Sequence, residues 1–272
     1  MHDYIIYNAS IAGVAFAIEK KRAGASVLLL NHYGFCGGVI TESLALQQKT
    51  NGLEGIVKEL FEAIQKEHRA LFGQAEDEVI LNPEVVKSVL LYQLMEAGVE
   101  CLFHVHPKEI KEEQDGITLQ LVAKEGLIER KAKRVIDASF EQHIGHLYHG
   151  QKRTLQSVVL NLMTTVPQKE RFLTWAPIDK AIKTADGRYF LTLVPEKGTG
   201  YNALIGNALT DHLTIHLQAD GARIQLLPTQ ALLSYQEAPQ MKGEVQCVPT
   251  YAANEAFKTA NEFLKSLIAL EV

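Results

Sequence analysis

The first 30 residues constrain the fold more than any other part of the chain. Residues 3–7 and 26–30 are short apolar runs, and residues 11–22 between them have the pattern of a helix. The polar turn at residues 8–10 can cap that helix, and Gly24 is a stop signal behind it. Two continuous apolar strands joined by a helix predict a β-α-β unit in a parallel sheet buried on both faces.

Composition and charge narrow the possible partners. The 272 residues include 47% hydrophobic and 22% charged residues, the balance of a folded globular protein. A formal charge of −5 without a long basic run does not favour nucleic acid or an anionic membrane. A small-molecule substrate or a protein partner is therefore expected, and the oligomeric state stays open.

The N-terminal residues and the cysteine spacing predict the cellular compartment of the protein. The N-terminal residues lack the pattern of a signal peptide, and no apolar run reaches the roughly 20 residues of a membrane helix. Cys36, Cys101 and Cys247 are widely spaced, which favours free thiols in a reducing compartment over a disulfide framework. These features predict a cytoplasmic protein.

Further along the chain, helix and strand patterns alternate up to about residue 150, and strand patterns dominate after it. Asp115-Gly116 is a strong hairpin signal, and Asn82-Pro83 is a strong helix start. The expected elements are helices over residues 53–71 and 83–97, strands over residues 99–106, 108–134, 135–138, 158–165, 189–194, 202–205 and 213–217, and an amphipathic closing helix after residue 253.

This order predicts an α/β fold with two parts. Residues 1–150 together with 248–272 are expected to form a Rossmann-like domain with a parallel sheet. Residues 151–247 are expected to form a smaller, β-rich, substrate-type region. Open α/β sheets bind ligands in the crevice outside the carboxyl ends of their strands, so we expect the second region to cover that edge.

The turn after the first strand corresponds to a dinucleotide-binding fingerprint in which two of three glycines are replaced. That fingerprint is G-x-G-x-x-G, and residues 8–13 read "NASIAG", so only Gly13 is retained. Asn31 follows the second strand, where an acid usually accepts hydrogen bonds from the ribose.

The wider pattern resembles a known family. The runs "DYIIYNASIAGVAFAIEKKRAGASVLLLNHYGFCGG", "NPEVVKSVLLYQLMEAGVECLFHVHPKEI" and "RKAKRVIDASFEQ" are similar to FAD-dependent oxidoreductases that carry a "GF-x-GG" loop and a later "DATGD" motif. The resemblance covers roughly residues 3–143. It implies a Rossmann-type fold, FAD as cofactor and oxidoreductase activity on an unidentified small molecule.

The same resemblance implies a set of cofactor-binding positions. The first turn would face the pyrophosphate, Asn31 the ribose and Val105 the adenine region, while Phe140 replaces the glycine of the later motif. The full set is Asn8, Ser10, Ile11, Ala12, Gly13, Asn31, His32, Gly37, Gly38, Val105, Ala138 and Ser139.

The altered motifs leave alternatives open. One is a non-catalytic relative that has kept the fold, lost FAD and acts as a binding or partner subunit, and another is an enzyme that binds a different ligand in the same crevice. No residue stands out as a general acid or base, and no metal site is expected.

Several side chains allow both a functional and a structural interpretation. Cys36 could lie beside a flavin, but a buried thiol is the commoner case. The histidines at 143, 146 and 149 share a helical face that is more simply an exposed polar surface than a metal site. His104 and His106 are expected to alternate along one strand.

Overall fold

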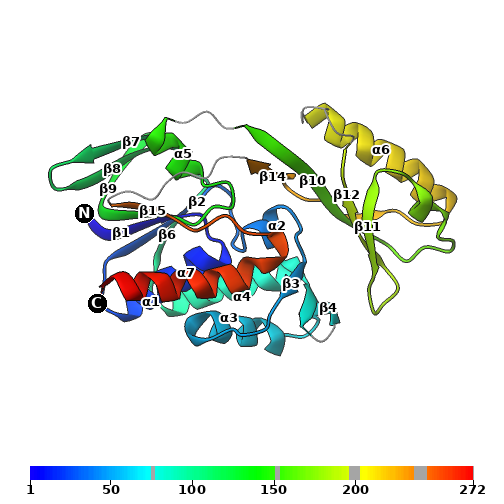
Figure 1. Ribbon diagram of the computed structural model, residues 1–272, viewed down its shortest axis with the longest axis horizontal. Helices are drawn as coiled ribbons and strands as arrows, with labels where there is room; N and C mark the ends of the chain where they lie inside the picture. Colours follow the sequence, from blue (N-terminus) through cyan, green and yellow to red (C-terminus); the bar gives the residue numbers. More distant parts are fainter. Residues whose placement is uncertain (75–76, 151–153, 196–202, 236–243, 272) are drawn as a thin grey trace.

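The computed structural model describes residues 1–74, 77–150, 154–195, 203–235 and 244–271. Its main sheet has the strand order β6-β2-β1-β9-β8-β7, with β15 also paired to β9 (Figure 1). The bounds are β1 His2–Tyr7, β2 Val27–Asn31, β6 Glu100–Phe103, β7 His106–Glu113, β8 Gly116–Ala123, β9 Gly126–Asp137 and β15 Val245–Cys247.

The predicted β-α-β opening is confirmed. β1 pairs in parallel with β2, from Tyr4 opposite Val27 to Tyr7 opposite Leu30, and the helix α1 that joins them spans Ile11–Arg22. β9 has two roles: its first half pairs antiparallel with β8, and its second half pairs parallel with β1. The hairpin and the strand predicted before residue 138 are therefore one continuous element.

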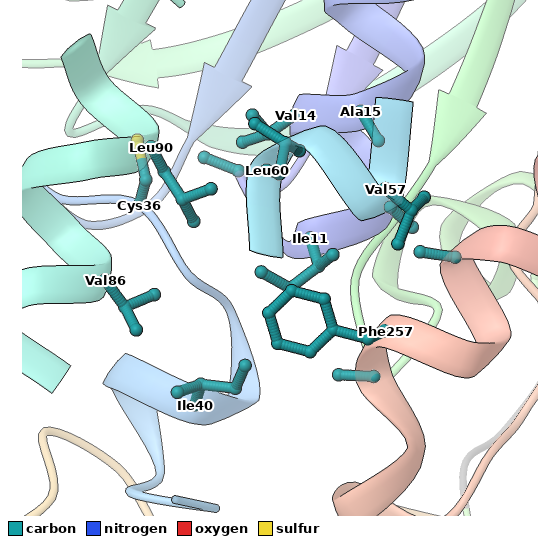
Figure 2. Packing of buried hydrophobic residues seen from close by; sticks show 14 of the residues in the cluster. Ile11, Val14, Ala15, Cys36, Ile40, Val57, Leu60, Val86, Leu90 and Phe257 are labelled. Carbon is teal, nitrogen blue, oxygen red and sulfur yellow. The ribbon is translucent and has the colours of Figure 1, made fainter. Parts of the chain in front are cut away.

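A layer of helices covers one face of this sheet (Figure 1). It contains α1, α3 (Gly55–Lys66), α4 (Pro83–Glu96) and the closing helix α7 (Ala256–Glu271). In Figure 2, side chains of α1 meet those of the other three helices, among them Ile11, Val14, Val57, Leu60, Leu90 and Phe257. This packing explains why the chain returns to the first sheet after the second region.

The second region has its own sheet, in the order β11-β12-β10-β13 with β14 also paired to β10. Its strands are β10 Leu155–Thr164, β11 Ile178–Lys183, β12 Tyr189–Leu193, β13 Ile224–Leu226 and β14 Leu232–Tyr235. Helix α6 (Ala203–Ala219) and the short helix η1 (Arg171–Thr174) pack beside it.

Short elements complete the fold. β3 (Gln47–Lys49), β4 (Leu71–Gln74) and β5 (Glu78–Leu81) form a small sheet. The short helices are α2 (Val39–Glu42), α5 (His143–His149) and η2 (Ala253–Glu255). Among the described helices, none combines the length and the apolarity that crossing a membrane requires.

Two predicted strands are wrong because their residues lie in α6. The predicted strand at 202–205 is helical from Ala203 onward, and Asn202 lies outside the described residues. In the predicted strand at 213–217, Leu213 and Leu217 are buried one helical turn apart, whereas Ile215 is 65% exposed. A strand would have placed all three on one face.

The predicted strand over residues 99–106 is also interrupted. His104 has a left-handed backbone with φ of 58°, so β6 ends at Phe103 and β7 begins at His106. The two histidines therefore do not alternate along one strand.

The second region covers the carboxyl edge of the main sheet, as expected. The backbone N–H groups of Thr229 and Gln230 donate to the carbonyl oxygen of Glu42, at 2.9 and 3.1 Å, and Asn161 Nδ2 donates to the carbonyl of Ser43 at 3.0 Å. The domain division at residues 150 and 248 stays a prediction. Because β15 already pairs with β9, we propose that the return to the first domain begins at Val245.

Candidate functional site at the carboxyl edge of the main sheet

A cavity of about 210 Å³ lies where β1, β2 and β9 end and the second region begins. Open α/β sheets bind ligands at this edge. Its lining consists of Tyr7, Asn8, His32, Tyr33, Val39, Glu42, Ser43, His106, Ser139, Phe140, Glu141, His143, Gln230 and Leu232. Three of the predicted cofactor-binding residues, Asn8, His32 and Ser139, therefore face one cavity.

The turn between β1 and α1 keeps the backbone shape of the fingerprint without its first two glycines. Asn8 has φ of 78°, a left-handed conformation that asparagine tolerates better than most residues. A Cβ atom at Gly13 would lie 2.1 Å from the carbonyl oxygen of Asn8 and 3.1 Å from the Cβ of Ala138. Gly13 therefore serves the close packing of helix on strand that the third glycine provides.

The protein itself occupies much of the turn's hydrogen-bonding capacity. Ser10 Oγ accepts from the N–H of Gly13 at 3.2 Å and donates to the carbonyl of Ala138 at 2.8 Å. The glycine loop packs directly on this turn, because a Cβ atom at Gly38 would lie 2.7 Å from the Cβ of Ser10. The N–H of Gly37 donates to the carbonyl of Ala9 at 2.7 Å.

Asn31 is fully buried and bonds to the protein rather than to the cavity. Its Oδ1 accepts from the N–H of Ala9 at 2.9 Å, and its Nδ2 donates to the carbonyls of Tyr33 and Phe35 at 3.1 and 2.7 Å. Both amide N–H groups are thus used internally. This geometry does not support Asn31 as a ribose ligand. Its side chain instead hydrogen-bonds the β1–α1 turn to the loop after β2.

Other predicted positions are also buried in the fold. Ile11, Ala12, Val105 and Ala138 are at most 5% exposed, and the N–H of Val105 donates to the carbonyl of Asn31 at 3.1 Å. Only a backbone contact with a ligand would be open to such residues.

Asp137 organises the loop after β9. Its carboxylate accepts from the N–H of Ser139 at 3.0 Å, from Ser139 Oγ at 2.5 Å and from the N–H of Gly145 at 3.0 Å. Burial raises the pKa of Asp137, and these donors oppose the rise. The predicted ligand Ser139 therefore has its hydroxyl proton committed to a neighbour within the same loop.

Phe140, which replaces a family glycine, forms part of the cavity wall. Its ring packs edge-to-face on Tyr251, with ring centroids 5.1 Å apart. The side chain therefore fills space beside the cavity that a glycine would leave open.

Glu42 is the residue of this site that sequence reasoning missed. It is 4% exposed, its Oε1 accepts from Asn8 Nδ2 at 3.1 Å, and its Oε2 accepts from Gln230 Nε2 at 3.3 Å. Burial raises the pKa of Glu42 to about 7, the hydrogen bond from Asn8 lowers it, and nearby Glu141 raises it further. The signal in the sequence was a single acid within the otherwise uncharged stretch of residues 34–48.

Stability should therefore depend on the protonation of Glu42. Because the folded-state pKa lies above the ordinary value of 4.5, its contribution is fully present below about pH 4.5 and is lost as the pH rises through about 7. The difference is of the order of 3 kcal/mol. Thermal melts from pH 5 to pH 8 should show a smaller decline in Glu42→Gln than in the wild type. Equal declines in both proteins would contradict this assignment.

Histidine rings border the cavity. His32 Nδ1 and His106 Nδ1 are 3.3 Å apart, and the ring centroids of His106 and His143 are 4.7 Å apart. Burial lowers the pKa of both His32 and His106, and their mutual proximity lowers that of His32 further. Neutral rings are therefore expected at pH 7.

The other candidate residues have structural positions. His146 in α5 is 5% exposed, so the predicted exposed histidine face is wrong. Across the described part of the chain, no group of three His, Cys, Asp or Glu side chains is arranged to hold a metal ion. Cys36 is fully buried, and burial raises the pKa of its thiol to about 12, which fits a core residue.

Several solved structures are similar to this fold. The p-nitrophenol 4-monooxygenase PnpA from Pseudomonas putida DLL-E4 matches with a TM-score of 0.68 and 15% identity over 99% of this chain and 80% of that chain. The anhydrotetracycline hydroxylase OxyS from Streptomyces rimosus matches with a TM-score of 0.66 and 14% identity over 98% and 62%.

A ternary complex of aklavinone-11 hydroxylase with FAD and aklavinone matches with a TM-score of 0.63 and 12% identity over 99% of this chain and 62% of that chain. The chain thus spans less than two thirds of the length of both hydroxylases. At these identities the matches show the fold alone, and they confirm the predicted α/β class. The search of curated proteins gives no match.

The sequence also matches a family model. The model of the FAD dependent oxidoreductases covers residues 3–153 of 272. This match extends over more than half of the sequence, and the chain therefore belongs to the FAD dependent oxidoreductase family.

Proposed function

We propose that this chain is a small-molecule-binding member of the family, in which its own side chains occupy the part of the cleft that FAD would need. FAD is the cofactor that family membership implies, and in a flavoenzyme it supplies the hydride chemistry. The observation that carries the proposal is the buried Glu42 hydrogen-bonded to Asn8 at the β1–α1 turn.

The residues of the turn do not fit a pyrophosphate. A pyrophosphate needs N–H donors and positive potential, which a helix N-terminus with free amides supplies. Here the N–H groups of Ala9 and Gly13 are bonded to Asn31 and Ser10, which leaves at most those of Ser10, Ile11 and Ala12 for a phosphate, and the Glu42 carboxylate is hydrogen-bonded to Asn8 of the turn. An ionised Glu42 beside this turn would repel a phosphate rather than attract it.

The size of the cavity supports the same proposal. Ligand pockets usually measure about 300–1,000 Å³, and this cavity of about 210 Å³ lies below that range. FAD is larger than this cavity, so its binding would require the hydrogen bonds that the lining residue Gln230 makes with Tyr33 and Glu42 to open. A smaller ligand needs no such change.

The alternative is a working flavin-dependent oxidoreductase, which the family match favours. The two proposals differ in whether the protein itself holds flavin. We expect protein purified without added flavin to be colourless, and to remain so after incubation with excess FAD and desalting. The visible absorbance spectrum checks this, and a yellow protein with close to one flavin per chain would overturn the proposal.

A further inference from the structure

We propose, on the basis of the function proposed above, that the cavity binds a small organic cation, a primary ammonium with an aromatic or similarly compact apolar body. The cavity presents hydrogen-bond acceptors and negative charge where the family's cofactor would need donors. It is also bordered by aromatic rings. These three features together select the ligand class.

The first feature is an unpartnered acceptor. Asn8 is 6% exposed and lines the cavity; its Nδ2 donates to Glu42, and its Oδ1 is buried at the rim of the turn without a hydrogen-bond partner. A buried acceptor without a donor costs about 1–3 kcal/mol, so a ligand that supplies an N–H group regains a hydrogen bond if the Asn8 amide turns to bring Oδ1 to the cavity. A phosphate or carboxylate ligand has no donor to offer.

The second feature is the charge. Glu42 and Glu141 line the cavity together with His32, His106 and His143, and lowered pKa values keep His32 and His106 neutral at pH 7. An ammonium group would hydrogen-bond an ionised carboxylate with a charge-assisted bond, roughly twice as strong as a neutral one. The cavity therefore discriminates by charge in the direction opposite to a nucleotide site.

The third feature is the aromatic rings in the cavity wall. Tyr7, Tyr33 and Phe140 contribute rings to the lining, and aromatic faces attract cations as well as apolar groups. An engineered apolar cavity of about 150 Å³ holds benzene, so a cavity of about 210 Å³ has room for a ring with a short ammonium arm.

Binding should be linked to the ionisation of Glu42. The titratable groups that interact electrostatically with Glu42 come from several elements. They are Glu141 after β9, Tyr7 at the end of β1, Tyr33 and Cys36 after β2, and Tyr251 before α7. None of the tyrosines or the thiol ionises near pH 7, because their pKa values are raised. Loss of the Glu42 proton to solvent then accompanies cation binding, and the affinity should rise about tenfold from about pH 6 to about pH 8.

Calorimetric titration with benzylammonium, with benzyl alcohol and benzoate as neutral and anionic counterparts, tests the proposal. We expect benzylammonium to bind more tightly than benzyl alcohol, benzoate not to bind, and Glu42→Gln to lose at least tenfold in affinity for benzylammonium. Glu262→Gln removes an equal charge from an exposed position on α7 and should bind like the wild type. Thermal melts confirm that both variants are folded.

Benzoate binding as tightly as benzylammonium, or more tightly, would overturn the inference. Absence of benzylammonium binding at about 10 mM, a concentration well above a Kd of about 1 mM, would also overturn it. If Glu42→Gln fails to fold, the pH dependence of wild-type binding decides, since an affinity that is flat or falls with rising pH contradicts the linkage. A protein that binds neither FAD nor benzylammonium would refute this inference alone. A protein that binds FAD stoichiometrically would refute the proposed function.

Discussion

Replacing Asn31 by aspartate should lower the free energy of unfolding by about 3–5 kcal/mol at pH 7, although it restores the acid that the family uses. The Asn31 amide donates to the carbonyls of Tyr33 and Phe35, and the side chain is fully buried. A carboxylate there would lose both donors and place a negative charge against two carbonyl oxygens. The variant would therefore bury an uncompensated charge.

The pH dependence of this variant identifies the cause. Burial against two carbonyls raises the pKa of the new carboxyl in the folded state, so stability should be recovered as the pH falls and the group takes up a proton. Chemical denaturation at pH 5 and pH 8 measures both effects. The exposed Asn51→Asp is the matched control and should change stability by less than about 0.5 kcal/mol. If the folded Asn31→Asp variant is as stable as this control, the hydrogen bonds of the Asn31 amide do not hold the turn and the loop together.

Truncating Phe257 to alanine should cost about 3–5 kcal/mol, because it removes a fully buried ring from the helix that closes the first domain. The ring packs edge-to-face on Phe61, with centroids 5.3 Å apart, and lies in the core shared by α1, α3 and α4 (Figure 2). Loss of the ring leaves a cavity between α7 and α3.

Denaturant unfolding measures the loss of unfolding free energy in Phe257→Ala and in Tyr92→Ala. The comparison shows whether the cost comes from removing a buried ring or from removing any aromatic ring. Tyr92 on α4 is 57% exposed, so its truncation should cost under about 1 kcal/mol. Similar losses in the two variants would mean that α7 does not complete the first domain.

Much of the first domain could be predicted because local signals agree with the tertiary structure. Asn82 caps α4 through the N–H of Glu84, and Pro83 occupies the first turn, as their order in the sequence predicted. In α6 the local signals were ambiguous. Leu213, Ile215 and Leu217 fit a strand by alternation, and only the exposure of Ile215 shows that the relevant spacing was four residues.

Three of the predicted cofactor-binding residues, Asn8, His32 and Ser139, line the candidate cavity, whereas Glu42 was not predicted. The fingerprint located the turn, and Asn8 and Gly13 have the backbone roles that it implied. Sequence comparison by position could not reveal that the Asn31 side chain hydrogen-bonds to the protein backbone. It also could not reveal that Glu42, eleven residues later, accepts a hydrogen bond from Asn8. Both depend on how the loop after β2 folds back on the turn, which is a tertiary contact without a local signal.

Titration of wild-type protein with FAD, followed by quenching of flavin fluorescence, tests the central claim most directly. The claim is that the protein's own side chains take the place of the pyrophosphate at the β1–α1 turn. It predicts no saturable quenching at flavin concentrations up to about 100 µM, which corresponds to a binding free energy weaker than about −5.5 kcal/mol. Saturable binding of one FAD per chain with a Kd near or below about 1 µM would contradict it.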